Sequence, residues 1–208
     1  YVAAGCYDGN VYLLNKDGDL VSKYHTGGSV RWVRFSPNGK YLGFGPTEKG
    51  AEYFGLFEVP TLKKVWEGIV GDWVRTVAFS KDGRLVAAGS SNGALNVFSS
   101  DGKKLWQASN GGLVPFLIGF DENGRIATGG KGRRVMVYDS SGKLLWSKFV
   151  DHVITAGNMA DNGAIGIGTV GGYVHYFNSD GSIAFRRMHG GVGHNGIYLT
   201  RNGKYLLA

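Results

Sequence analysis

Short apolar runs separated by polar turn residues follow one another along the whole chain. Residues 71–110 show the pattern best, with runs at Trp73–Phe79, Arg84–Gly89, Ala94–Phe98 and Lys104–Ala108. Runs of this length, bounded by Gly, Asn, Asp and Ser, are typical of β-strands joined by tight turns. This segment is therefore predicted to form four antiparallel strands.

The turn residues recur about every 40 residues, which is the spacing of a repeat protein. The first marker, between the first and second runs, is Asn38-Gly39, Asp82-Gly83, Asn123-Gly124, Asn162-Gly163 and Asn202-Gly203. Tight hairpin turns need residues with positive φ, which Gly adopts freely and Asn or Asp tolerates. Each pair therefore predicts a hairpin.

Two further markers and one aromatic position recur with the same period. The second marker is Asp8-Gly9, Lys49-Gly50, Asn92-Gly93, Lys131-Gly132 and Gly171-Gly172. The third is Asp17-Gly18, Asp101-Gly102, Ser141-Gly142 and Asp180-Gly181, with Pro60-Thr61 in the remaining unit. The aromatic residue of the fourth run is Tyr24, Trp66, Trp106, Trp146 or Phe185. Three turns predict four strands per unit, and the regular aromatic position predicts packing between units.

A single four-stranded sheet of about 40 residues cannot bury both of its faces, whereas sheets stacked radially can. The chain is therefore predicted to be all-β, a β-propeller of four-stranded antiparallel blades with about five repeats visible. The expected organisation is one domain, 1–208, with repeats at 1–27 (partial), 28–70, 71–110, 111–150, 151–190 and 191–208 (partial). A larger ring is favoured over five blades closed by joining the termini.

Several segments resemble known propeller repeats. Gly39-Lys40-Tyr41-Leu42 and Gly83–Ser90 look like the second strand of WD-type repeats. Asp8–Leu14 and Ser141–Trp146 look like quinoprotein-type (PQQ-like) repeats. The resemblance implies a propeller but no particular activity, because propellers carry many functions. No unit has a Gly-His opening with a Trp-Asp close, so the His–Asp network of WD repeats is not expected.

The net charge and the residue types limit the partners and the binding sites that are expected. A net charge of +7 favours an acidic partner, but the Lys and Arg residues are spread along the chain, so nucleic acid is not the expected partner. The five His show no metal-ligand spacing, and the single Cys cannot build a cysteine zinc site. No apolar run reaches the ~20 residues of a membrane-spanning helix. We therefore expect no cofactor, no metal and no transmembrane segment in this sequence.

Catalytic motifs are equally scarce. No Gly-x-Ser-x-Gly elbow occurs, and most Asp residues stand in predicted turns, where turn chemistry explains them. The sequence favours a non-catalytic scaffold that binds a protein or ligand through its loop face. Two alternatives stay open: a quinoprotein-like dehydrogenase or other propeller enzyme, and a structural part of a cell-surface assembly. The repeat style favours a prokaryotic envelope or extracellular location.

One set of residues is the candidate binding site. Val30-Arg31-Trp32 and Trp73-Val74-Arg75 begin equivalent inner strands, so Arg31 and Arg75 are expected at the mouth of the central channel. Loops from all blades converge there, and Arg and Trp are common interface anchors. With residues of related loops, the predicted basic aromatic patch is Arg31, Trp32, Trp73, Arg75, His152 and His194.

Overall fold

The computed structural model describes residues 1–48, 52–109, 114–190 and 196–207, and these contain strands and no helix. The first sheet has three strands, β1 (Val2–Gly5), β2 (Asn10–Leu14) and β3 (Leu20–His25). The next two sheets have four each: β4 (Val33–Phe35), β5 (Tyr41–Phe44), β6 (Tyr53–Glu58), β7 (Lys64–Ile69); and β8 (Val74–Phe79), β9 (Leu85–Ser90), β10 (Ala94–Ser99), β11 (Lys104–Ser109).

Two more four-stranded sheets and a pair complete the described chain. They are β12 (Pro115–Phe120), β13 (Ile126–Gly130), β14 (Arg134–Tyr138), β15 (Leu144–Phe149); then β16 (Ile154–Met159), β17 (Ile165–Thr169), β18 (Tyr173–Phe177), β19 (Ile183–Met188); then β20 (Tyr198–Leu199) and β21 (Leu206–Leu207). All pairings are between consecutive antiparallel strands. The predicted all-β fold of four-stranded antiparallel blades is confirmed.

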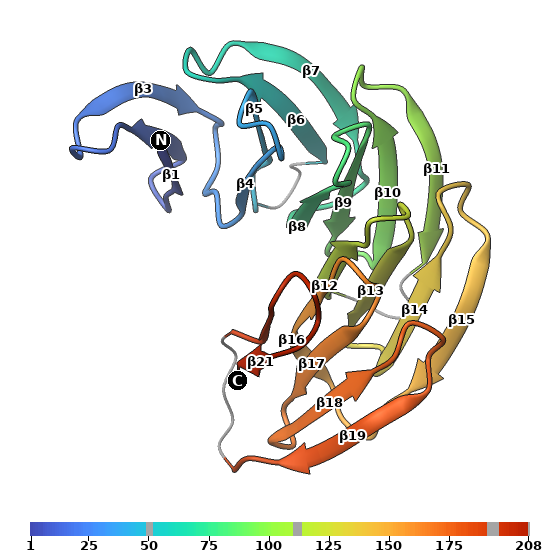
Figure 1. Ribbon diagram of the computed structural model, residues 1–208. Helices are drawn as coiled ribbons and strands as arrows, with labels where there is room; N and C mark the ends of the chain where they lie inside the picture. The colour runs from blue at the N-terminus through green and yellow to red at the C-terminus, as the bar shows by residue number, and fades with distance from the viewer. Residues whose placement is uncertain (49–51, 110–113, 191–195, 208) are drawn as a thin grey trace.

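The sheets follow one another along an arc, with the first strand of each blade toward the centre and the fourth strand outside (Figure 1). The three-stranded sheet and the C-terminal pair lie at the two ends of this arc (Figure 1). Strand β1 pairs with β2, and β20 pairs with β21. Within the described residues, no sheet contains strands from both termini.

Turn chemistry sets the strand ends. In the 71–110 segment, all four predicted strands are found with ends shifted by at most one residue. In the turn after β8, the Ser80 hydroxyl donates to Asp82 Oδ1 at 2.6 Å, and the Arg84 amide donates to the same oxygen at 3.0 Å. These bonds lower the pKa of the Asp82 carboxyl, and the bond from Ser80 has the largest effect. Gly83 supplies the positive φ of 71°.

One predicted turn marker is wrong by one residue. In the β13–β14 turn the left-handed conformation belongs to Arg133, with φ of 55°, and not to Gly132. A side chain in this region costs about 1 kcal/mol or more, so the turn is strained where the equivalent turns have Gly9, Gly93 and Gly172. The predicted Lys49-Gly50 turn lies outside the described residues.

A tryptophan–glycine contact joins successive blades. The indole N–H of Trp66, Trp106 and Trp146 donates to a carbonyl in the next blade's third turn: Ser100 at 2.9 Å, Ser140 at 2.9 Å and Ser179 at 3.2 Å. The same turn lays its glycine on the indole ring. A Cβ on Gly102, Gly142 or Gly181 would lie 2.7, 2.8 or 2.8 Å from the ring. The expected packing of the outer-strand aromatics between blades is confirmed at these junctions.

The glycine contact can be tested by a matched pair of substitutions. Gly142 and Gly18 occupy equivalent third turns with φ of 91° and 89°, but a Cβ on Gly18 meets nothing within 4 Å. Gly18→Ala should lose about 1 kcal/mol through backbone strain. Gly142→Ala should lose about 2 to 4 kcal/mol, because overpacking against Trp106 adds to that strain. Urea unfolding followed by circular dichroism measures both, and equal losses would contradict the contact.

His175 is buried in the junction between the last two four-stranded blades. Its ring stacks on Phe177 at 6.1 Å, and neither ring nitrogen has a hydrogen-bond partner among the described residues. Asn96 occupies the equivalent position of another blade, two residues before Phe98. Its side-chain amide donates to the Val70 carbonyl at 3.3 Å. Burial, followed by the positive charge of Arg186, lowers the pKa of His175.

This environment predicts a loss of stability in mild acid. Since the pKa of His175 is lower in the folded than in the unfolded chain, the unfolded chain binds more protons, and stability falls as the pH drops below the usual His value of about 6.5. His175→Asn should reduce this fall, because an amide does not titrate there. Thermal unfolding midpoints of the native protein and of His175→Asn, measured between pH 7 and 5, test this prediction. All other His residues are the same in the two proteins, so a difference between the curves comes from His175. Parallel curves for the two proteins would refute the assignment.

Candidate binding mouth and central channel

Each inner strand begins where the chain returns from the outer strand of the preceding blade, so the starts of inner strands lie at one mouth of the channel. Arg31 stands just before β4, and Arg75 is the second residue of β8. The Arg31 guanidinium lies 5.2 Å from the ring centre of Tyr7. The Arg75 guanidinium lies 5.2 Å from the ring centre of Trp73, and its Nε donates to Ser91 Oγ at 2.6 Å. Both cations are therefore oriented by aromatic rings.

The two guanidinium groups are close enough to influence each other. The pKa of Arg75 is lowered, first by burial and then by the positive charge of Arg31, while Asp72 acts in the opposite direction. No carboxylate forms an ion pair with Arg31 or Arg75 within the part of the chain that the structure describes. The positive charges at this mouth therefore have no direct ion-pair partner among the described residues, although Asp72 acts on Arg75. We call Arg31, Trp73 and Arg75 the basic mouth.

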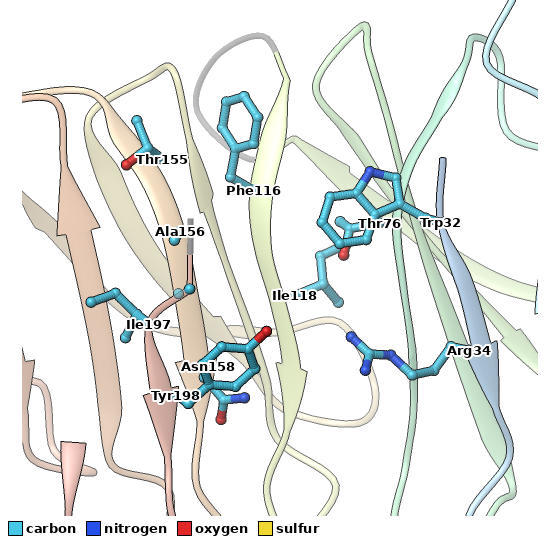
Figure 2. Close-up of a pocket in the computed structure, with 12 residues that line it drawn as sticks. Trp32, Arg34, Thr76, Phe116, Ile118, Thr155, Ala156, Asn158, Ile197 and Tyr198 are labelled. Carbon is cyan, nitrogen blue, oxygen red and sulfur yellow. The ribbon is translucent and has the colours of Figure 1, made fainter. Parts of the chain in front are cut away.

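The structure describes two of the other three predicted patch residues. Trp32 is 41% exposed and lines the central channel beside the mouth (Figure 2). His152 stacks in parallel on Tyr173, with ring centres 5.8 Å apart, in the last four-stranded blade. His194 lies outside the described residues. The structure thus brings Arg31, Trp73 and Arg75 together and gives His152 a different partner.

The central channel contains a cavity of about 660 Å³ that the sequence analysis did not single out. Residues from the inner strands of five sheets line it, among them Trp32, Arg34, Thr76, Phe116, Asn158 and Tyr198. Figure 2 shows the Trp32 and Phe116 rings toward one end and the Arg34, Asn158 and Tyr198 side chains toward the other. A sequence signal for these three exists: each stands five residues before the glycine of a first turn marker.

The comparison with known families agrees with the blade structure. A model of the WD domain, G-beta repeat family matches residues 61–99. This segment contains β7 of one blade and β8, β9 and β10 of the next. The chain is a WD-repeat-like β-propeller. None of the curated proteins compared with this WD-repeat-like propeller matches it. The quinoprotein-type resemblance has no corresponding match and stays an expectation.

In the described ranges, no three His, Cys, Asp or Glu side chains cluster in a way that could hold a metal ion. The same residues include no helix with the length and apolar character needed to cross a bilayer.

Proposed function

We propose that this WD-repeat-like propeller is a non-catalytic scaffold that binds an acidic segment of a protein partner at the basic mouth. WD repeats commonly mediate protein interactions, which supports a role of this general kind. The observation that carries the proposal is the pair of guanidinium groups that influence each other and form no ion pair with a carboxylate of the described chain.

Electrostatics favours an anionic partner at this position. Two neighbouring cations repel each other, and the attraction of both to a bound carboxylate offsets this repulsion. Binding an acidic segment is therefore more favourable than binding a neutral one. Arg guanidinium groups also bind carboxylates through paired hydrogen bonds. The net charge of +7 adds a long-range attraction for an acidic partner, which raises the rate of encounter.

Aromatic surface beside the cations supplies contact area. Tyr7 is 74% exposed next to Arg31, and Trp73 lies against Arg75. Arg and aromatic residues dominate the binding energy of many protein interfaces. The stacked rings also restrict the guanidinium groups before a partner arrives, which reduces the entropy lost on binding. An acidic segment that includes an apolar side chain therefore fits the mouth best.

The proposal is tested with a fluorescently labelled short peptide of Glu and Gly residues that contains one Phe. The double substitution Arg31→Glu, Arg75→Glu should weaken its binding at least about tenfold and reduce the dependence of binding on salt, because both cations are reversed. Fluorescence anisotropy at low and physiological ionic strength measures both quantities.

The matched control is Lys40→Glu, Arg84→Glu. These residues follow the turns at the opposite ends of β4 and β8, and the change in net charge is the same. The control should keep most of the affinity. Equal weakening by both double variants would mean that net charge alone attracts the peptide, and unchanged binding in the mouth variant would reject the mouth as the site.

A further inference from the structure

The polar end of the channel cavity is not part of the basic mouth. Arg34 lies on the inner strand β4 between Val33 and Phe35, which pack toward the core, so its side chain points to the opposite side, into the channel. Its guanidinium forms no hydrogen bond or ion pair with any described residue. Arg34 is the one charged residue among those that line the cavity in the described structure.

Two neutral polar side chains share this end of the cavity. Tyr198 on β20 directs its hydroxyl toward the Arg34 guanidinium across the cavity, and Asn158 on β16 lies at the same end (Figure 2). Neither side chain has a hydrogen-bond partner in the described residues. All three groups can donate hydrogen bonds, and together they could surround an oxygen anion.

The rest of the cavity is mostly apolar. Trp32 and Phe116 lie toward the other end, and Ile118 lies between them and the polar groups (Figure 2). The volume of about 660 Å³ is within the usual range for sites that bind small molecules, roughly 300 to 1,000 Å³. A ligand with a carboxylate at one end and a flat apolar body at the other matches this division.

We propose that the channel is a second binding site, separate from the basic mouth, and that it takes small aromatic carboxylates. The carboxylate accepts hydrogen bonds from Arg34, Asn158 and Tyr198, while the ring lies against Trp32 and Phe116. The charge of Arg34 selects acids over their neutral amides, and the aromatic end selects flat apolar bodies over small ions such as acetate.

Calorimetric titration with indole-3-acetate tests this site. The acid should bind with a Kd of about 1 mM or tighter. Indole-3-acetamide and acetate should each bind at least about tenfold more weakly, since the first lacks the charge and the second lacks the ring. A Kd for indole-3-acetate much weaker than this, or equal binding of the amide, would overturn the proposal.

Substitutions assign the binding to the channel. Arg34→Gln should weaken indole-3-acetate at least about tenfold, and Arg34→Lys, which keeps the charge, should weaken it less. Lys143→Gln, in an outer turn, removes the same charge and should leave binding unchanged. Arg34 is exposed and unpaired, so thermal midpoints should stay the same and exclude unfolding. Equal affinity of Arg34→Gln and the native protein would overturn the proposal, while peptide binding at the mouth is judged by separate variants.

Discussion

The contact between an outer-strand indole and the glycine of the next blade's third turn holds the blades together. In this contact the indole N–H donates to a turn carbonyl, and the turn glycine lies on the indole ring with no room for a Cβ. The contact recurs at Trp66, Trp106 and Trp146. At the first junction Tyr24 packs on Phe57 instead, with ring centres 4.6 Å apart. Because each blade contacts only its neighbours, the stability of the arc is a sum over such junctions.

The binding features follow from these junctions. The outer contacts repeat from blade to blade, and the inner strands lie together on the concave side of the arc (Figure 1). Residues far apart in the chain, such as Arg34 and Tyr198, then line the same cavity. Some side chains that line the channel also pack between blades, as Ile118 does, whereas Arg34 belongs to no packed cluster of the described residues and carries a charge there.

The sequence patterns predicted some of these features and missed others for physical reasons. Strand ends in the 71–110 segment were predictable because Ser80, Asp82 and Gly83 determine a turn through local hydrogen bonds and a positive φ. The Lys131-Gly132 prediction was wrong by one residue because the left-handed conformation lies at Arg133, a residue type that rarely adopts it. A glycine in a sequence shows where such a conformation is easy, and it does not show which residue adopts it.

By itself, the sequence determined the blade, because turn residues and alternating apolar positions act over a few residues, and it determined which inner strands begin with Arg31 and Arg75. Only the tertiary structure decided which of these side chains meet. In the described chain it forms no ion pair with Arg31 or Arg75, it stacks His152 on Tyr173, and it places Arg34 at a cavity. The cavity depends on distances between blades, which are set by packing across sheets, and the His152 contact depends on strand pairing within one blade.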